Sequence, residues 1–191
     1  MRGYFGIGME GVTKAMNVGS LFRTAHAFGA SFVFTVAAAY PRAEGRKADT
    51  SRTEGQVPFY AFPDPEALVL PQDCVLVGVE ILDDAIELPS FRHPRRAAYV
   101  FGPERGALSP ALAVRCRHLV RIPTRFSVNV GIAGAILMYD RLITLGRFPR
   151  RPEWPEGEPE ALPEPVFGDP KLRRSLEDYR AAPPEPTPRR R

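Results

Sequence analysis

Two short segments together supply residue types that suit a ligand site: the first has glycine and a carboxylate, and the second has small polar side chains. Residues 101–106 read F-G-P-E-R-G and end an apolar run. A glycine at position 102 would let a ligand approach the backbone closely. Glu104 would then lie at the carboxyl end of a strand, where open α/β sheets bind their ligands. Residues 122–129 read I-P-T-R-F-S-V-N, a second apolar run that ends in a polar loop.

A third segment with chemical potential lies near the start of the chain, where residues 17–23 read N-V-G-S-L-F-R. Asn17 is a favourable N-cap residue. On a helix that begins there, Ser20 and Arg23 would be neighbours, three positions apart. The same residues are equally typical of a capped helix that carries an exposed arginine. The residues alone therefore leave both interpretations open.

Taken together, the three segments resemble the three motifs of the SpoU/TrmH branch of the SPOUT RNA methyltransferases. The first matches the pattern N-x-G-x-x-x-R, and residues 122–133 are similar to I-P-M…S-L-N-V-S-x-A. Fewer residues separate Pro123 from Ser127 than in many members, and Gly131 replaces the second serine. The resemblance covers residues 1–146. It implies an α/β fold, in which a SPOUT-type parallel sheet has helices on both faces and a C-terminal deep trefoil knot.

The resemblance also implies the reaction, which is transfer of a methyl group from S-adenosylmethionine to a ribose 2′-hydroxyl of RNA. By position it assigns catalytic roles to Arg23, Asn17, Glu104, Ser127 and Asn129, and cofactor binding to Val79, Gly102, Ile122, Ser127 and Val128. In the family the arginine accepts the hydroxyl proton. A guanidinium has a pKa above about 12, so Arg23 could instead orient the phosphate and the hydroxyl, and the sequence leaves both roles open.

Alternating apolar segments would position these motifs. Strands are expected at residues 4–7, 32–36, 74–80, 97–101 and 118–122. Helices are expected at residues 18–28, ended by Gly29, at 110–115, capped by Ser109, and at 131–145, with a weaker pattern at 65–70. Near-continuous apolar strands suit a parallel sheet that is covered on both faces. The alternation of strands and helices indicates a doubly wound α/β domain.

Other chemistries find less support in the sequence. Residues 6–11 match the dinucleotide fingerprint G-x-G-x-x-G, but no helix opens at Gly8 and no acidic residue follows residues 32–36 to hold a ribose. We expect these glycines to let the loop after the first strand pack closely. His26, His93 and His118 have no evident partners in the sequence, and no metal site is expected.

The charge distribution favours a polyanionic partner. The net charge is +4 and the isoelectric point is about 9.3. Residues 149–191 carry nine basic and nine acidic side chains, so the excess lies on residues 1–148. Such an excess suits RNA, because neutralising phosphates drives this kind of binding. The long polar segment at residues 40–57 is expected to be an RNA-facing loop.

Composition divides the chain into two parts. Residues 1–148 are expected to form the catalytic domain, and residues 149–191, with 11 of the 21 prolines, an extended tail that has one short helix near 171–179. No apolar run approaches the ~20 residues that span a bilayer, and no secretion signal is evident. Cys74 and Cys116 are expected to be unpaired thiols. These features indicate a cytoplasmic protein.

The segment 131–145 is apolar nearly all round, which indicates burial in a core or an interface. Members of the resembled family are homodimers that share the active site, so we expect a dimer in which Arg23 reaches the partner's cofactor pocket. The favoured substrate is tRNA. The alternatives are a 2′-O-methyltransferase of rRNA, a base methyltransferase, and a non-catalytic RNA-binding SPOUT protein.

Overall fold

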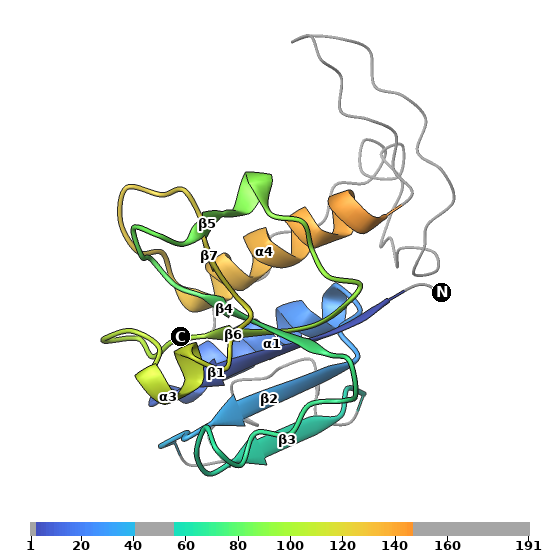
Figure 1. Cartoon of the computed structure of the whole chain (residues 1–191). Helices are drawn as coiled ribbons and strands as arrows, with labels where there is room; N and C mark the ends of the chain where they lie inside the picture. Colours follow the sequence, from blue (N-terminus) through green and yellow to red (C-terminus); the bar gives the residue numbers. More distant parts are fainter. Residues whose placement is uncertain (1–2, 41–55, 147–191) are drawn as a thin grey trace, which may run out of the picture. The chain divides into compact units, whose positions relative to one another are not determined.

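The computed structural model describes residues 3–40 and 56–146, and a seven-stranded parallel sheet in the order β3-β2-β1-β6-β4-β7-β5 forms its centre (Figure 1). The strands are β1 (Tyr4–Glu10), β2 (Phe32–Val36), β3 (Phe59–Phe62), β4 (Val75–Val79), β5 (Ile86–Glu87), β6 (Arg96–Phe101) and β7 (His118–Arg121). Because all paired strands run parallel, their carboxyl ends share one edge. Met9, Phe101, Val79 and Val120 lie in one row across four strands, so the loops that follow them emerge side by side.

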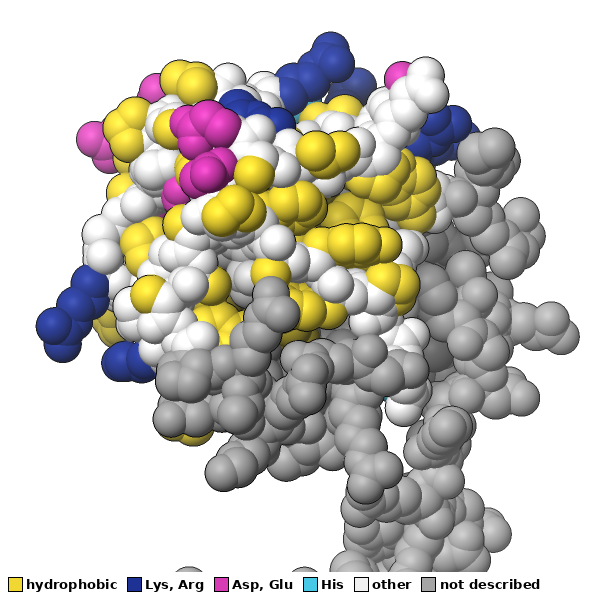
Figure 2. Space-filling view, turned by 90° about the horizontal axis from the view of Figure 1, so that it is seen from below, with side chains coloured by type: hydrophobic (Ala, Val, Ile, Leu, Met, Phe, Trp, Pro, Cys, Tyr) yellow, Lys and Arg dark blue, Asp and Glu magenta, His cyan; other side chains and the backbone are white. Residues whose placement is uncertain are grey.

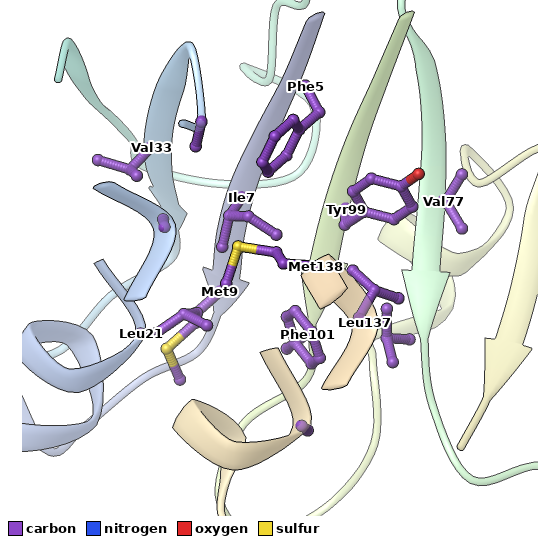
Figure 3. Close-up of a cluster of buried hydrophobic side chains, with 14 of the residues drawn as sticks. Phe5, Ile7, Met9, Leu21, Val33, Val77, Tyr99, Phe101, Leu137 and Met138 are labelled. Carbon is purple, nitrogen blue, oxygen red and sulfur yellow. The ribbon is translucent and has the colours of Figure 1, made fainter. Parts of the chain in front are cut away.

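Helices cover both faces of the sheet. On one face α1 (Ala15–Ala27) and α4 (Val130–Leu145) pack against β1 and β6, and Figure 3 shows Leu21 of α1 and Leu137 of α4 among the side chains of these strands. The other face is covered by α3 (Pro110–Ala113) through Leu112, together with Leu68 and Leu108. A short 3-10 turn, η2 (Leu88–Ser90), precedes β6. The predicted α/β parallel sheet with helices on both faces is confirmed.

Most elements that the apolar runs predict are present, with small shifts of their ends. The short edge strand β3 was missed because only four residues form it, and its two central ones are exposed. Residues 65–70 do not form the weakly predicted helix; a turn there is held instead by the Asp64 carboxylate, which accepts the Ala67 N–H at 2.7 Å.

Two of the three glycines in the G-x-G-x-x-G segment have a packing role within β1, not in the loop after it as expected. A Cβ atom at Gly6 or Gly8 would overlap the ring of Phe32 or of Phe34, respectively, on the neighbouring strand β2. Gly11 lies after the strand and has a φ of +59°, a conformation that glycine adopts readily. The segment therefore accommodates aromatic side chains, and it does not open a dinucleotide-binding helix.

A buried polar network joins α4 to the amino-terminal edge of the sheet. Arg141 donates to the Tyr99 hydroxyl at 3.0 Å, and the ring of His93 lies 2.7 Å from that hydroxyl and 2.9 Å from the Asp140 carboxylate. Burial lowers the pKa of His93, against the opposing effect of Asp140, and raises that of Tyr99 to about 12. The neutral imidazole therefore donates through Nε2 to Asp140 and accepts a hydrogen bond from the Tyr99 hydroxyl through Nδ1. These partners of His93 are not evident from the sequence.

The outer edge at β3 carries an apolar hollow lined by side chains that include Phe32, Tyr60, Phe62 and Leu70. Figure 2 views the molecule from the β3 side, where hydrophobic side chains gather across the middle of the face and charged ones lie toward its margins. Tyr60 and Val69 line this hollow and are 50% and 74% exposed. None of the described helices is long and apolar enough to cross a membrane.

Several expectations concern residues outside the described ranges. These are most of the polar segment at 40–57 and the whole proline-rich tail with its short helix at 171–179.

The deep trefoil knot stays a prediction. Cys74 and Cys116 are free thiols, as expected.

Candidate active site at the carboxyl edge of the sheet

A pocket lies at the carboxyl edge of the sheet, where β4, β6 and β7 end and α4 begins. It is lined by Val79, Glu80, Ile81, Phe101, Gly102, Ile122, Thr124, Ser127, Val128, Val130 and Ala133. The structure thus brings together all five residues that the sequence motifs assign to cofactor binding. Most of the remaining lining residues were not singled out, although each is near one of the five in the sequence.

Gly102 forms part of the pocket wall. A Cβ atom at this position would lie 2.8 Å from Oε2 of Glu80 and 3.0 Å from the backbone nitrogen of Leu108. A side chain here would displace the Glu80 carboxylate and press on the backbone at Leu108. The protein's own packing therefore favours glycine at this position.

Glu104 is the centre of a polar cluster beside the pocket. Its carboxylate accepts hydrogen bonds from the side chain of Asn17 at 2.9 Å, from the Lys14 backbone N–H at 3.1 Å, and from the backbone N–H and hydroxyl of Thr13, both at 3.3 Å. These groups follow β1 and begin α1, whereas Glu104 follows β6. Because β1 and β6 are adjacent, the two loops meet although about 90 residues separate them.

The same contacts correct the expected start of α1. The helix begins at Ala15 and its N-cap residue is Lys14, whose side chain makes no capping bond. Asn17 lies within the first turn and does not cap the helix. The carboxylate of Glu104 accepts the N–H groups of Thr13 and Lys14, the two residues that directly precede the helix. Negative charge at this end of a helix is favourable, because the helix dipole is positive there.

Asn129 extends the cluster to α4. Its side-chain nitrogen donates to Oδ1 of Asn17 at 3.1 Å, while its own Oδ1 accepts the Gly131 N–H at 2.9 Å and so caps α4. Each amide has its orientation fixed, because Asn17 donates to a carboxylate and accepts from Asn129. The chain Glu104–Asn17–Asn129 therefore holds three predicted catalytic residues in one hydrogen-bonded line, and we call it the carboxylate–amide cluster.

Partial burial raises the pKa of Glu104. The hydrogen bonds from the Asn17 side chain and from the backbone N–H groups of Thr13 and Lys14 lower it by a larger amount, so the pKa lies below its usual value. The carboxylate is thus ionised at neutral pH. An ionised carboxylate accepts hydrogen bonds only, which matches the donors that surround it. Its role in the structure is to position Asn17 and the start of α1.

The remaining two predicted catalytic residues occupy different places. Ser127 is exposed and lines the pocket, in the loop between β7 and α4. Arg23 is exposed on α1 and is not among the residues that line the pocket. It shares a helix face with Ser20, and Ser20 packs against Gly131 at the start of α4. Within one chain the structure therefore does not bring Arg23 to the cofactor pocket.

Within the described residues, no group of three or more histidine, cysteine, aspartate or glutamate side chains is arranged to hold a metal ion. The chemistry available at this edge is that of a mostly apolar pocket beside an ionised, fully hydrogen-bonded carboxylate. Such a site can bind a ligand with apolar and polar parts and orient a hydroxyl group next to it.

The chain is similar to several known proteins. The model of the SpoU rRNA methylase family matches residues 5–139. Among solved structures, the SpoU methyltransferase AviRb from Streptomyces viridochromogenes, in complex with AdoMet, is 22% identical with a TM-score of 0.64, over 75% of this chain and 61% of that one. An RNA 2′-O ribose methyltransferase is 22% identical with a TM-score of 0.66, over 75% and 57%.

A further structure, described as giving insights into the 2-OH methylation of C/U34 on tRNA, is 18% identical with a TM-score of 0.66, over 76% of this chain and 98% of that one. No curated protein sequence matches the chain. The structural likenesses establish the SPOUT fold, and this chain spans about three fifths of the length of the first two proteins. S-adenosylmethionine is the cofactor of SpoU methyltransferases. The match over residues 5–139 takes in all three motifs, and the chain belongs to the SpoU rRNA methylase family.

Proposed function

We propose that this protein transfers a methyl group from S-adenosylmethionine to a ribose 2′-hydroxyl of RNA. The observation that carries the proposal is that the pocket lined by all five expected cofactor residues adjoins the carboxylate–amide cluster. Gly102, in the pocket, is two positions from Glu104, in the cluster. Val128 and Asn129 form the same junction at the start of α4.

The pocket residues fit the cofactor by their chemistry. Ile122, Val128 and Ala133 offer apolar surface to an aromatic base, and the backbone beside Gly102 is open to polar groups. When bound, S-adenosylmethionine supplies an electrophilic methyl group. The protein's part is to align the acceptor hydroxyl with that methyl group, and positioning of this kind contributes strongly to rate.

The carboxylate–amide cluster would serve the acceptor side of the site. Glu104 fixes Asn17, and Asn17 in turn fixes Asn129, so the polar surface next to the pocket is rigid before RNA arrives. Ser127 is exposed at the junction and can contact the ribose. Arg23 is assigned the orientation of the target phosphate and hydroxyl, because a guanidinium with a pKa above about 12 is a poor proton acceptor.

Because Arg23 does not line the pocket of its own chain, it can complete a site only in a second copy of the chain. The exposed residues Ile132, Ile136 and Tyr139 form an apolar stripe along α4, at 56%, 38% and 51% exposure, with helical spacing. Met16, at 73% exposure, adds apolar surface on α1. We propose that this stripe is covered in a homodimer, so that Arg23 of one protomer serves the pocket of the other.

Exposed side chains around the pocket suit RNA. Lys14 and Arg105 flank Glu104, and Arg125 and Phe126 belong to the loop that lines the pocket. Phe126 is 77% exposed, and RNA-binding proteins use such aromatic rings to stack unpaired bases. We favour tRNA as the substrate, a choice supported by the match that covers 98% of a protein studied for tRNA 2-OH methylation. We also propose a cytoplasmic location.

The first test is to incubate the purified protein with methyl-labelled S-adenosylmethionine and with tRNA and rRNA fractions from a strain that lacks its gene. Nucleoside digestion and mass spectrometry then identify the labelled product. Label on a 2′-O-methyl nucleoside of tRNA supports the proposal in full, and label in rRNA alone changes the substrate. Label on a base, or no label in any fraction, refutes it. The latter result would favour an RNA-binding protein without turnover, consistent with the short loop between Pro123 and Ser127.

The shared site has its own test, which uses two inactive variants. Arg23→Ala removes the arginine, and Gly102→Val obstructs the pocket. When the two are co-expressed, an arginine that acts across the interface restores one intact site in each mixed dimer. Random pairing makes half of the dimers mixed, so about a quarter of the wild-type activity returns. No recovery, in mixed dimers that circular dichroism shows to be folded, would show that Arg23 acts within its own chain.

A further inference from the structure

Glu80 is the one charged residue among those that line the pocket. It directly follows β4, at the carboxyl edge of the sheet, and its position is next to Val79. None of the three sequence motifs contains it, and the roles proposed above do not use it. A charged group at the wall of an otherwise mostly apolar pocket is where specificity for a polar part of a ligand arises.

The Glu80 carboxylate is held firmly in place. Its Oε2 accepts the Leu108 N–H and its Oε1 accepts the Ile81 N–H, both at 2.9 Å. The backbone at Gly102 lies directly against Oε2. A carboxylate has about four lone-pair sites, so each oxygen retains capacity for another donor. The group is thus fixed before any ligand binds, and it is still able to accept two further hydrogen bonds.

The strand order indicates which part of the cofactor lies nearest to Glu80. Glu104 and Asn17, which form the carboxylate end of the cluster, follow β6 and β1, so the reacting end of the cofactor belongs there. Glu80 follows β4, the next strand beyond β6, and neighbouring strands are about 4.8 Å apart. The apolar side chain of Ile122, suited to the base, follows β7, the next strand beyond β4. The sugar links the base to the reacting end, and it therefore passes Glu80.

We propose that Glu80 accepts hydrogen bonds from the two adjacent ribose hydroxyls of the cofactor and so selects a ribonucleoside with an intact diol. The proposal rests on the proposed function, because it assigns this residue to the same pocket. Two O–H donors on neighbouring carbons suit the two oxygens of one carboxylate, and hydrogen bonds to an ionised acceptor are the stronger kind. Glu80 would then be a cofactor-specificity residue.

A purely structural explanation exists, because Glu80 also ties the end of β4 to the loop at Leu108. The experiment must therefore separate recognition from loop support. The probes are S-adenosylhomocysteine and its 2′,3′-dideoxy analogue, and their dissociation constants are measured by calorimetry on wild type, Glu80→Gln and Glu66→Gln. Glu66 is exposed and lies outside the pocket, so it is the matched control.

We expect wild type and Glu66→Gln to bind S-adenosylhomocysteine at least about tenfold more tightly than the dideoxy analogue, because two hydrogen bonds to a charged group are lost. In Glu80→Gln the dissociation constants of the two probes differ by no more than about threefold, since a neutral amide retains one acceptor. The affinity for the dideoxy analogue hardly changes. If Glu80→Gln weakens both probes equally and keeps the ratio, Glu80 only supports the loop and the inference is wrong.

Failure of the wider proposal gives a different pattern. A wild-type protein that binds neither probe and methylates no RNA refutes the proposed function together with this inference. A wild-type protein that methylates RNA but does not distinguish the two probes refutes the role of Glu80 alone.

Discussion

The replacement Glu104→Gln tests how the carboxylate–amide cluster is held together. Glutamine has the same shape, but it lacks the charge and offers one accepting oxygen in place of two. The carboxylate now accepts four hydrogen bonds, from Thr13, Lys14 and Asn17. With glutamine, either the donors on Oε1 or those on Oε2 lose their acceptor and face an N–H group instead.

The magnitude follows from the geometry of these bonds. The two contacts on Oε1, at 2.9 and 3.1 Å, are well formed, whereas the two on Oε2, at 3.3 Å, are long. Hydrogen bonds to a charged group contribute about 1.5–3 kcal/mol each, against about 0.5–1.5 kcal/mol for neutral ones. Loss of the charge on two good bonds therefore costs about 2 kcal/mol. Solvent at this partly exposed group reduces the figure to about 1–1.5 kcal/mol, which lowers Tm by about 2–6 °C.

The stability that Glu104→Gln loses relative to wild type depends on pH in a defined direction. The pKa of Glu104 is lower in the folded protein than its ordinary value of 4.5. The unfolded chain therefore binds the proton more readily, and the stability that the carboxylate contributes is present above pH 4.5 and declines as the pH falls through the folded-state pKa. The glutamine variant has no such group. The difference in stability between the two proteins must narrow as the medium becomes acidic.

The assay is urea unfolding of wild type, Glu104→Gln and Glu66→Gln, followed by circular dichroism from pH 7 to pH 3. Glu66 is an exposed carboxylate and provides the control for loss of one charge. We expect the control to match wild type at neutral pH. An equal stability of Glu104→Gln and wild type at pH 7, or a gap that stays constant to pH 3, would refute the assigned role of the carboxylate.

Three further outcomes follow from the described contacts. Burial lowers the pKa of His93 below its ordinary 6.5, so stability should fall as the pH drops from about 6.5 toward the folded-state value; a His93→Gln variant whose urea midpoint follows pH in the same way would contradict this. Gly134→Ala should lower Tm by about 2–4 °C, because the added methyl group overlaps buried Leu21 and overpacking costs more than the helix preference of alanine returns; a raised Tm would show that the two helices separate freely. Ile136→Glu should shift the protein from dimer to monomer in sedimentation, and an unchanged mass would remove the α4 stripe from the interface.

Sequence patterns predicted those parts of the fold that depend on local hydrophobicity. The runs in β2, β4 and β6 are apolar because both faces of these strands are buried. The edge strand β3 lacks this signature, since its central residues are exposed. A short strand at the margin of a sheet is defined by the pairing with its neighbour, and such pairing is not visible in one segment alone.

The site shows the same division between local and distant causes. The family resemblance predicted five of the residues that line the pocket, and they lie at or after the ends of strands that the apolar pattern locates. The start of α1 was misplaced because Asn17 is a good N-cap in isolation. In the folded chain Glu104, distant in sequence, receives the N–H groups of Thr13 and Lys14. The His93 partners were missed for the same reason, since Asp140 is 47 positions away.

Helix α4 is fastened at both of its ends, and this restricts how the molecule can respond to ligands. Asn129 bonds to Asn17 at the carboxyl edge of the sheet, while Asp140 and Arg141 bond to His93 and Tyr99 at the opposite edge. A slide of one helical turn, about 5.4 Å, would break both sets of bonds at once. The helix therefore keeps its position, and the loop between β7 and α4 is the part that moves when the cofactor binds. In hydrogen exchange, amides of residues 122–128 should change their protection when the cofactor binds, while those in the middle of α4 exchange at the same rate in both states.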